Sequence, residues 1–563
     1  MHFCNRDDIP VPPEIDPSSA SNPEYDYLNV GGTIDVDESA PTEKEVTEVL
    51  STFKNRRCMG IDGIWGEQLK YGAGSSGLVG LLVSLLTLIW ATLLVPLSWT
   101  GSEFCCIFKN KGSNREAKNY RAISITATLS RLFSQIFLNR IRAAYNVLLL
   151  RTQCGFRTGV GTDDAIWGIS QCIKKSKTGF YVLFIDLTAA YDKIPRKHLF
   201  LCLLRRIKCS MLLEILRSIY NGTTGKIKRA KKSFPLGAGV RQGALESPVI
   251  FNIYFDLVLR VIKNRLVAEI GDDFGIDFHY IIPIEVTTRE MRSKCRQSHG
   301  KFTITELLYA DDAAFFFKSI AAMQKAIDII VQELTRFGLI LSIGKTETMA
   351  INTTQEEQTK ASLATCNGIE LKNTQSFKYL GLMTSTQNEE KFLEHRIALA
   401  LSKFQQIKHV LGNSQIDMKI RIKYMNSFVR SRLTYSAATW DLSASQISKL
   451  EVVWCRLLRR MVNRGFKRRE DYSMVFTNSD IYRITGAEPI ENYLRKQQLR
   501  WVGHVCRMCN SSFQKRLLFS ATAKFKTDLW IKLEKISNLD RSQLRRLMMD
   551  RQNFSSWLKS CFC

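Results

Sequence analysis

Two adjacent aspartates at the turn of an apolar hairpin constrain the fold of this chain more than any other feature. The runs Glu306–Tyr309 and 313–317 are β-prone and flank Ala310-Asp311-Asp312. This pattern predicts two strands joined by a short turn that carries both acids. Burial and mutual repulsion oppose the ionisation of neighbouring carboxylates, and bound divalent cations remove that conflict because hard oxygen ligands suit Mg²⁺. A solvated Asp-Asp turn that only ends a hairpin is the alternative for this pair taken alone.

A third aspartate follows another apolar run. Residues 181–185 are continuous and β-prone, and Asp186 comes directly after them. Carboxylates at the ends of separate strands can converge on one site. Two cations about 3.5–4 Å apart then activate a hydroxyl group, orient a phosphate and stabilise the leaving group. Positioning and charge neutralisation supply most of the rate at such a site. The three aspartates therefore predict a two-metal phosphoryl-transfer centre.

The net charge favours a polyanionic partner. Lys and Arg number 80 and Asp and Glu number 53, which leaves a formal charge of +27 at pH 7. An excess of this size is typical of nucleic-acid binding that weakens as salt is added. A basic protein without a polyanionic partner and a protein that binds anionic membranes are the alternatives. The apolar fraction of 45% is ordinary and argues against wholesale disorder.

Cysteine usage indicates a reducing compartment. The 15 cysteines are scattered singly or in short pairs, with an odd count and no regular framework. Residues 1–8 hold no apolar run, so a secretory signal is not expected. We expect an intracellular protein of the nucleus, the cytoplasm or both.

Residues 78–97 are nearly all apolar and long enough to cross a bilayer. A membrane helix and a buried helix both suit that length. The nearest Lys or Arg residues are Lys70 and Lys109, so no basic cluster flanks the stretch. Residues 96–99 then lead into an apolar and basic stretch. We therefore expect a buried helix and no membrane partner.

The character of the chain changes along its length. Residues 1–41 are rich in Pro, Asp, Glu and Ser and predict a flexible acidic leader. A capped amphipathic helix is expected from Thr42. Strand-like and helical runs alternate from about 100 to 350, and long amphipathic helices with many basic residues follow after about 385.

The order of short motifs resembles the reverse transcriptases of non-long-terminal-repeat (LINE-like) retrotransposons. Each motif is weak alone, but eight in the family's order form a specific pattern over about 42–510. The palm motifs of that family resemble, in order, 184–192, 239–243 with Ser247-Pro248, 309–312, 344–347 and 377–381. The finger blocks resemble 107–112, 119–124 and 153–157, and a segment found after the thumb resembles 499–508.

This resemblance implies an RNA-directed DNA polymerase with an α+β right-hand fold. Fingers would span 42–180, a palm with a mostly antiparallel sheet 181–380, a helical thumb 381–465 and a basic helical C-terminal region 466–563. The reaction would transfer deoxynucleotides to a primer 3′-end under the direction of a template. The implied partners are an RNA template, a DNA primer and deoxynucleoside triphosphates. The implied cofactor is a pair of Mg²⁺ ions, with Mn²⁺ as the alternative.

The resemblance also implies roles for matching residues. Metal ligation falls to Asp186, Asp311 and Asp312, which are also the catalytic residues, helped by the Leu187 carbonyl. Nucleotide binding falls to Lys109, Arg121, Tyr191, Gln242 and Lys345. Template and primer contacts fall to Gly243, Tyr379, Leu380 and Gly381.

Within that set the implied tasks differ. Lys109 and Arg121 would grip the triphosphate, Tyr191 would lie under the sugar and exclude a 2′-hydroxyl, and Lys345 would donate a proton to pyrophosphate. Gln242 and Gly243 would let the template-primer backbone approach closely. The plainer alternatives are a solvated basic face for the two finger cations, core packing for the tyrosine and surface charge for the lysine.

Two departures from the family's pattern bear on activity. Ala122 stands where proline is usual after the finger arginine, and Glu246 stands where an apolar residue is usual. A carboxylate near the template groove would repel phosphate. A catalytically degenerate nucleic-acid-binding protein that keeps the fold is therefore the second hypothesis. No endonuclease motif is evident beside the polymerase motifs, which is expected of a fragment or a degenerate copy of a larger element.

Two other groups favour packing over chemistry. The segment 504–509 holds one histidine and two cysteines but lacks an evident fourth zinc ligand. Three tryptophans have the capacity to stack on bases, but at helical spacing we expect them in the core. They are Trp440, Trp454 and Trp501.

Overall fold

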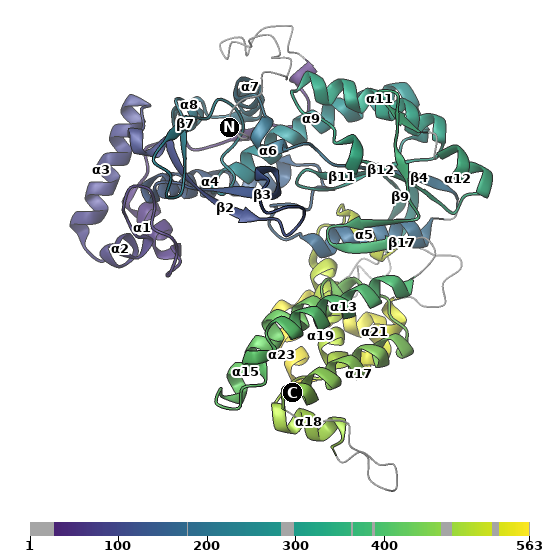
Figure 1. Cartoon of the computed structure of the whole chain (residues 1–563). Coiled ribbons are helices and arrows are strands. Elements are labelled where there is room, and N and C mark those ends of the chain that lie inside the picture. The colour runs from purple at the N-terminus through teal and green to yellow at the C-terminus, as the bar shows by residue number, and fades with distance from the viewer. Residues whose placement is uncertain are drawn as a thin grey trace, which may run out of the picture.

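The computed structural model describes residues 27–176, 178–282, 298–361, 364–385, 389–462, 476–520 and 529–561. A body that contains the sheets adjoins a set of C-terminal helices (Figure 1). This mixed architecture confirms the expected combination of helices and sheet. Most of the predicted leader (residues 1–26) and the basic run at 464–469 lie outside the described residues.

A five-stranded sheet forms the centre of the body. Its strand order is β10 (Glu306–Tyr309), β11 (Asp312–Phe317), β4 (Phe180–Ile185), β12 (Glu347–Ile351) and β15 (Lys372–Asn373). The β10–β11, β11–β4 and β4–β12 pairs are antiparallel, and β15 runs parallel to β12. The predicted hairpin around the paired aspartates is confirmed.

Both faces of β4 are covered, so all six of its residues are buried. Alternate side chains of a strand point to opposite faces. Tyr181, Leu183 and Ile185 join the core that holds α9 (Ser247–Ile270) and α11 (Ile320–Arg336). The intervening residues join a second core with α5 (Thr162–Lys175) and α19 (Ile490–Arg507). A continuous apolar strand is the expected sequence at such a position.

A second sheet lies in the N-terminal lobe. Its strand order is β3 (Tyr120–Ile125), β2 (Gly101–Phe108), β6 (Thr224–Ile227) and β7 (Ser233–Pro235). The neighbouring helices are α1 (Glu43–Thr52), α2 (Gly66–Gly72), α3 (Ser76–Thr92), α4 (Thr128–Leu148), α7 (Arg196–Arg206) and α8 (Ser210–Tyr220). The predicted cap at Thr42 is confirmed, because its side chain accepts from the Glu45 N–H and Glu45 accepts from the Thr42 N–H.

The apolar stretch 78–97 is buried on one face only. Val79, Leu82 and Leu86 of α3 are buried, but Leu81 is 67% exposed and Leu88 is 60% exposed. The expectation of a buried helix is therefore wrong for the outer face. No single helix in the described part of the chain is long and apolar enough to span a bilayer. The helix pair Gly66–Gly72 and Gly77–Thr92, which is bent by 116°, is long and apolar enough for a span only when the two helices are taken together.

The C-terminal helices have a core of their own. Residues of α13 (Glu389–Gln406), α17 (Ala444–Met461) and α19 pack around Phe404, Trp454 and Leu458. The three tryptophans named above are buried, which confirms their expected place in the core. His504 bonds to the Gly159 carbonyl at 2.7 Å, and Cys506 is buried.

Shorter elements complete the chain. They are β1 (Ile34–Asp35), α6 (Ala190–Lys193), β5 (Ile207–Lys208), β8 (Ile276–Ile282), β9 (Ser298–Ile304), α12 (Gln355–Ala361), β13 (Thr365–Cys366), β14 (Ile369–Glu370), β16 (Ser376–Tyr379), β17 (Leu382–Ser385), α14 (Lys408–Leu411), α15 (Met418–Tyr424), α16 (Ser431–Leu433), α18 (Asn478–Thr485), α20 (Phe513–Leu518), α21 (Leu529–Ser537), α22 (Arg541–Met549) and α23 (Arg551–Ser560).

Candidate active site

Strand register brings the three aspartates to one end of the central sheet. Ala313 of β11 pairs with Ile185 of β4, so the next step of the antiparallel ladder sets Asp312 opposite Asp186. Facing residues of such a pair have Cβ atoms about 4.5–5.5 Å apart. Asp311 lies in the turn between β10 and β11. Carboxylates from two separate parts of the chain therefore share one location.

The turn that carries the aspartates is held by a buried glutamine. Ala310 has a φ of +56°, in the left-handed region. Its N–H donates to Gln153 Oε1 at 2.8 Å, and Gln153 Nε2 donates to its carbonyl at 3.2 Å. Both backbone groups of the strained residue are thus satisfied by one side chain. Sequence analysis placed Gln153 in a motif but gave it no role.

Gly155 also packs against the backbone of the aspartate turn. A Cβ at this position would lie 2.3 Å from the Ala310 nitrogen, so only glycine fits against the turn. Asn252 of α9 donates to the Gly155 carbonyl at 2.8 Å. The Gly155 N–H donates to Gln153 Oε1 at 2.8 Å. The aspartate turn is therefore fixed to α9 through backbone and amide groups.

The aspartates oppose one another's ionisation. Burial and the charge of Asp186 raise the pKa of Asp311. The pKa of Asp312 is raised to about 6, mainly because burial removes water from the carboxylate and then because of the charges of Asp311 and Asp186. The Asp312 side chain remains exposed to solvent. A cation can therefore reach Asp312 from solvent and relieve the repulsion among the three carboxylates, which is one of the causes of the raised pKa.

Lys345 partly neutralises the cluster. Its Nζ lies 3.0 Å from both carboxylate oxygens of Asp186. The backbone explains the contact, because the Ser342 N–H donates to the Asp186 carbonyl and the Thr188 N–H donates to the Ile340 carbonyl, both at 2.8 Å. The Lys345 side chain is 65% exposed. A pair this exposed contributes about 0–1 kcal/mol, so a divalent cation can displace it.

The donor set fits a divalent cation in chemistry. Three carboxylates supply hard oxygens, and Leu187, next to Asp186, is held by a bridge to Leu341. Among the residues that the structure describes, no three acidic, histidine or cysteine side chains already converge on one ion position. The contact between Lys345 and Asp186 has to open for an ion to bind.

Tyr191 lies beside the acids. Its ring stacks on Phe251 with centroids 4.5 Å apart and an interplanar angle of 12°. Burial, and then the charge of Asp311, raise the pKa of its hydroxyl. The predicted sugar-binding position thus borders the carboxylate cluster and is fixed by α9.

The loop 239–246 contacts the N-terminal sheet. The Ser124 N–H of β3 donates to the Gln242 carbonyl at 2.6 Å. Gly243 has a φ of +116°, and a Cβ there would lie 2.8 Å from the Ser124 carbonyl. The backbone at Gln242 and Gly243 therefore lies directly on β3, as close approach by glycine permits.

Glu246 does not face a template groove, and that expectation is wrong. The side chain is 1% exposed and accepts from Arg241 Nη2 at 3.0 Å, Ser134 Oγ at 2.8 Å and Tyr220 OH at 3.2 Å. Arg241 is equally buried and donates to the Trp99 carbonyl at 2.8 Å. The carboxylate is neutralised inside the protein, so it cannot repel a nucleic acid outside.

The remaining predicted residues lie on two hairpins. Lys109 follows β2 and Arg121 belongs to β3, so both are in the N-terminal sheet, not the sheet of the aspartates. Both side chains are exposed. Ala122, where proline was expected, pairs with Cys106 in the same ladder. The structure does not bring these two cations onto the carboxylates.

The β16–β17 hairpin packs under β4. Tyr379 is 2% exposed, and Phe377 stacks on Phe184 at 3.9 Å. Leu380 and Gly381 form the turn with φ of +47° and +83°. Tyr435 OH donates to the Leu380 carbonyl at 2.8 Å. The Tyr379 side chain is therefore enclosed, and Leu380 and Gly381 are the partly exposed residues of this turn.

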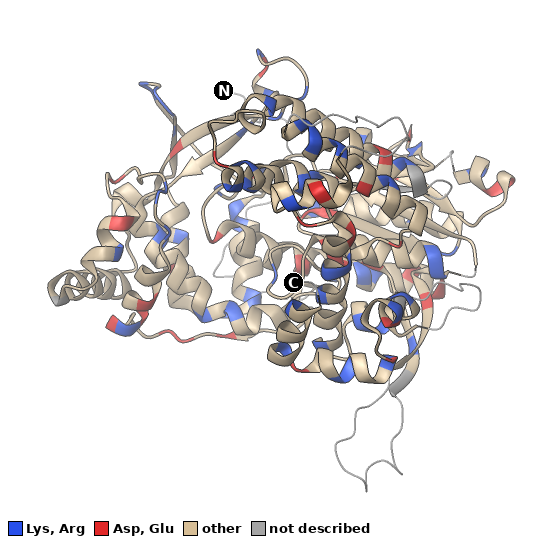
Figure 2. Cartoon of the chain, turned by 90° about the horizontal axis from the view of Figure 1, so that it is seen from below, with Lys and Arg blue, Asp and Glu red and all other residues tan. Residues whose placement is uncertain are grey.

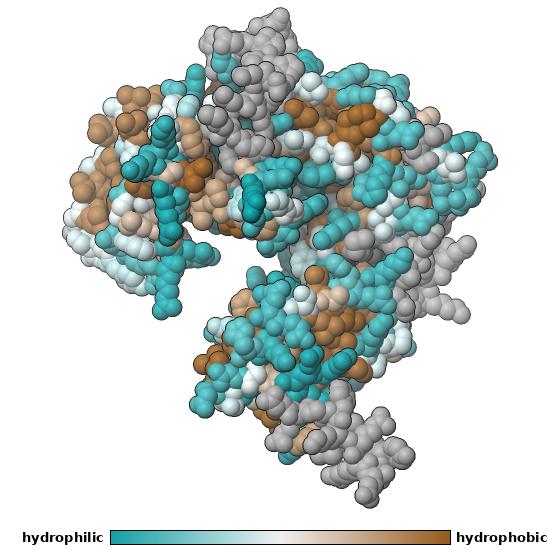
Figure 3. Space-filling model, in the orientation of Figure 1, coloured by the Kyte–Doolittle hydropathy of each residue, from teal (hydrophilic) through white to brown (hydrophobic). Residues whose placement is uncertain are grey.

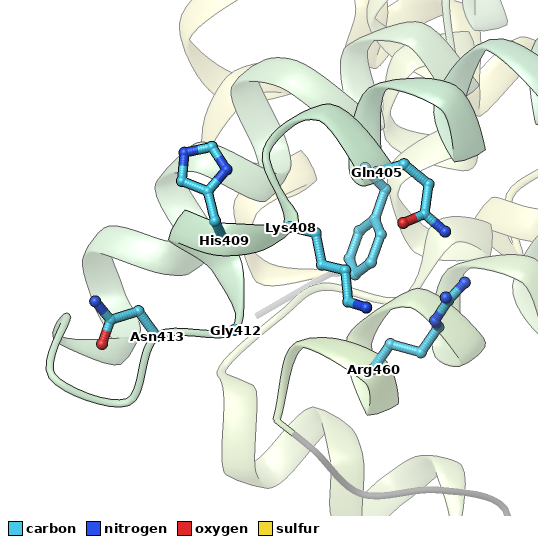
Figure 4. Close-up of a pocket in the computed structure, with 7 residues that line it drawn as sticks. Gln405, Lys408, His409, Gly412, Asn413 and Arg460 are labelled. Carbon is cyan, nitrogen blue, oxygen red and sulfur yellow. The ribbon is translucent and has the colours of Figure 1, made fainter.

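A separate cavity of about 550 Å³ lies among the C-terminal helices (Figure 4). Its lining contains two cationic side chains, one histidine and no acid. The lining residues are Phe404, Gln405, Lys408, His409, Gly412, Asn413 and Arg460. The Arg460 guanidinium lies 5.6 Å from the Phe404 ring centre. Such a lining suits an anion.

With this geometry in hand, comparison with known proteins decides the family. Residues 108–384 match the family described as reverse transcriptase (RNA-dependent DNA polymerase). The segment 108–384 is a reverse transcriptase domain, and its relatives include the RNA-directed DNA polymerases of non-long-terminal-repeat (LINE-like) retrotransposons. All the acids and the bracing residues Gln153, Gly155 and Asn252 lie inside the matched range.

Several relatives of this reverse transcriptase come from mobile elements. The RNA-directed DNA polymerase from mobile element jockey of Drosophila melanogaster is 20% identical over 79% of this chain and 46% of that protein. The Pol polyprotein from type-2 retrotransposable element R2DM of the same organism is 20% identical over 70% of this chain and 34% of that protein. A putative transposon-derived protein of Caenorhabditis elegans is 24% identical over 36% of this chain and 72% of that protein. The reverse transcriptase chain thus spans less than half the length of the two Drosophila relatives.

Removal of Glu246 should destabilise the protein strongly. A Glu246→Ala change leaves Arg241 buried and unpaired, which costs about 3–5 kcal/mol of unfolding free energy. The double change Glu246→Leu with Arg241→Met removes both charges and should cost less than the single change. Denaturant midpoints of the three proteins test this. A double variant less stable than Glu246→Ala would contradict the buried pair.

A methyl group at Gly155 should disturb the aspartate turn. Gly155→Ala forces Ala310 and its neighbour Asp311 to move, and a misplacement near 1 Å can cost about 10²-fold in rate. The matched control is Gly161→Ala, since nothing lies within 4 Å of a Cβ there and its φ is extended. The rate of nucleotide incorporation should fall in Gly155→Ala. The control Gly161→Ala should keep both the wild-type rate and the wild-type melting temperature. Equal rates for both would show that the contact with Ala310 is unimportant.

Divalent cations should stabilise the protein more at pH 7.5 than at pH 5. The pKa of Asp312 rises from its ordinary 3.8 to about 6 on folding. The metal-free protein therefore loses stability as the pH rises from about 4 to about 6, and the full repulsion among the ionised carboxylates is present only above that range. Mg²⁺ or Mn²⁺ relieves the repulsion where it exists. Melting temperatures with and without each ion check this, and Asp312→Asn should reduce the pH dependence, with Asp311 responsible for the remainder. An equal shift at both pH values would contradict it.

Proposed function

We propose that this chain is an RNA-directed DNA polymerase that extends a primer by two-metal catalysis. The observation that carries the proposal is the placement of Asp186, Asp311 and Asp312 at one end of β4 and β11 by the strand register. Such a set of carboxylates suits paired divalent cations and little else, because its own repulsion disfavours it. Membership of the reverse transcriptase family supports the same chemistry.

The lobes take the places of a right hand in this proposal. The N-terminal sheet serves as the fingers: β2 and β3 lie within 42–180, and β6 and β7 join the same sheet from within 181–380. The five-stranded sheet, whose strand β4 begins at Phe180, serves as the palm of 181–380. The helices of 381–465 serve as the thumb, and 466–563 form a basic C-terminal region. A hollow between the body and the C-terminal helices offers room for a template-primer duplex (Figure 3). The cationic cavity around Lys408 and Arg460 supports phosphate contacts on the thumb.

The three aspartates and the Leu187 carbonyl would hold two Mg²⁺ ions, with Mn²⁺ as the alternative. The bound ions supply activation of the primer 3′-hydroxyl and charge neutralisation on the triphosphate. Gln153 and Gly155 keep Asp311 and Asp312 in place while substrates exchange. Rigid support of this kind is needed because positioning provides much of the rate.

Lys345 has two successive tasks in this scheme. Without substrates its ammonium group neutralises Asp186 at 3.0 Å. Displaced from that carboxylate, Lys345 would lie beside the site. Its ammonium group is then available to bind the triphosphate and to donate a proton to the departing pyrophosphate.

The nucleotide would be bounded by residues from both sheets. Tyr191, held flat on Phe251, limits the space at the sugar and so selects a deoxyribose. Lys109 and Arg121 approach from the finger hairpin as it closes on the triphosphate. Gln242 and Gly243 present backbone on the opposite side, and the turn Leu380-Gly381 lies on the primer side.

The degenerate binding protein is the weaker of the two hypotheses. Its main support was the carboxylate of Glu246, and that group is buried and paired. Nothing in the arrangement of the three aspartates argues for loss of catalysis.

Primer extension on an RNA template tests the proposal directly. Asp311→Asn and Asp312→Asn should each lower the rate by at least about 10²–10³-fold, because each removes a charge that holds a cation. Binding of the template-primer should persist. Asp272→Asn is the matched control, since Asp272 is exposed on the turn Gly271–Asp273, which lies beside the end of β11 that is farthest from Asp312.

Two outcomes would contradict the proposal. One is a wild-type chain that binds template-primer with Mg²⁺ or Mn²⁺ but adds no nucleotide. The other is a full rate in Asp311→Asn. The first outcome would support the degenerate binding protein.

A further inference from the structure

The hairpin formed by β6 and β7 carries an unusual density of positive charge. Five of the seven residues from 226 to 232 are Lys or Arg, and all five are exposed. They are Lys226, Lys228, Arg229, Lys231 and Lys232. Within the described part of the chain, no carboxylate forms an ion pair with any of them. We refer to residues 226–232 as the basic hairpin.

The basic hairpin is anchored and is not a free loop. Phe104 of β2 and Phe234 of β7 stack with centroids 5.9 Å apart and an interplanar angle of 5°. Gly225 lies against both rings, where a Cβ would be 2.5 Å from Phe104 Cε2. The Lys228 N–H donates to the Phe104 carbonyl at 3.0 Å. The backbone that carries the cations is therefore held in place before any ligand arrives, which lowers the entropy cost of binding.

Strand direction places the basic hairpin beside the finger loop. β6 runs parallel to β2, and Ile227 pairs with Phe104. The turn after β6 and the loop after β2 therefore leave the sheet in the same direction, although β2 continues from Phe104 to Phe108 before its loop begins. That loop, 109–119, contains Lys109, Lys111 and Arg115. Figure 2 shows a narrow hairpin rich in Lys and Arg standing clear of the body at the upper left.

Protection of a sheet edge does not account for these charges. Natural sheets place lysines on edge strands to prevent pairing with other chains. Here β7 is the edge strand, and its residues Ser233–Pro235 include no lysine or arginine. The cations belong to the inner strand β6 and to the turn. Their position suits binding of a ligand at the tip of the hairpin better than protection of the sheet edge from pairing with another chain.

We propose that the basic hairpin binds the phosphodiester backbone of the unpaired template RNA ahead of the active site. The inference rests on the proposed function, because the finger loop is taken to hold the incoming nucleotide. That nucleotide pairs with the first unpaired template base, so a cationic surface beside its binding loop meets the unpaired strand. The tip from 226 to 232 has no aromatic residue for base stacking. Contacts are therefore to phosphate and independent of sequence.

The salt dependence of binding gives the expected size of the effect. Each phosphate contact on a single strand contributes about 0.7 to the slope of log affinity against log salt. Removal of four cations should therefore lower that slope by about 2–3. The loss should appear only when the template is long enough to reach the hairpin.

The test uses the full chain with Lys228→Gln, Arg229→Asn, Lys231→Gln and Lys232→Gln combined. Asparagine is chosen at 229 because Arg229 has a φ of +69°, which asparagine tolerates. Two RNA templates share one primer duplex and carry 5′ overhangs of about 2 or about 20 nucleotides, so that only the longer overhang offers an extended single strand to the hairpin. The control removes four exposed lysines on other elements: Lys44, Lys325, Lys360 and Lys559.

The wild type should bind the long-overhang template more tightly, and the hairpin variant should lose that gain alone. Extension on the short overhang should match the wild type, and the control should behave as the wild type on both. Failure of the polymerase proposal would give a different result, because neither the wild type nor either variant would extend either template.

Three results would overturn the assignment of the basic hairpin. One is a variant that retains the wild-type preference for the long overhang in both affinity and salt slope. Another is an equal loss of affinity for both templates, as a change in global charge would cause. The third is a variant that binds RNA normally but either loses binding to vesicles of anionic phospholipid or self-associates, which would assign the charges to a membrane or to edge protection.

Discussion

Repulsion among three carboxylates is the interaction on which the site depends. The β11–β4 register sets Asp312 opposite Asp186, and the turn adds Asp311. The raised pKa values of Asp311 and Asp312 record that conflict. Folding alone would avoid such a cluster, so the rest of the sheet has to hold it. In the absence of an ion, one exposed lysine supplies the only direct neutralisation of Asp186 that the described residues provide.

The structure that holds the cluster is mostly neutral. β4 is buried on both faces, which fixes its register against β11 and β12. Gln153 satisfies both backbone groups of Ala310, and Gly155 leaves no space for the turn to move. α9 joins these parts, because it contributes Asn252 beneath Gly155 and Phe251 beneath Tyr191. The buried Arg241–Glu246 pair then fixes the loop at the start of α9.

The sequence predicted what is local and periodic. The hairpin around Asp311, the strand before Asp186 and the capped helix at Thr42 follow from apolar pattern and turn chemistry, and the structure has them. Pairwise burial was not predictable from one sequence. Glu246 looked like a surface departure until Arg241, Ser134 and Tyr220 were found around it. The outer face of α3 and the contact between Gln153 and Ala310 also depend on residues distant in the chain. The roles of Lys109 and Arg121 stay predictions, because their sheet is separate from that of the aspartates.

The central claim is that the three aspartates share a pair of cations. A crystal structure with Mn²⁺, template-primer and an incoming nucleotide, read by anomalous scattering, tests it most directly. The account predicts two manganese peaks about 3.5–4 Å apart among Asp186, Asp311 and Asp312, with Lys345 moved off its carboxylate. Manganese bound elsewhere, or Asp186 more than about 8 Å from the other two carboxyl groups, would contradict it.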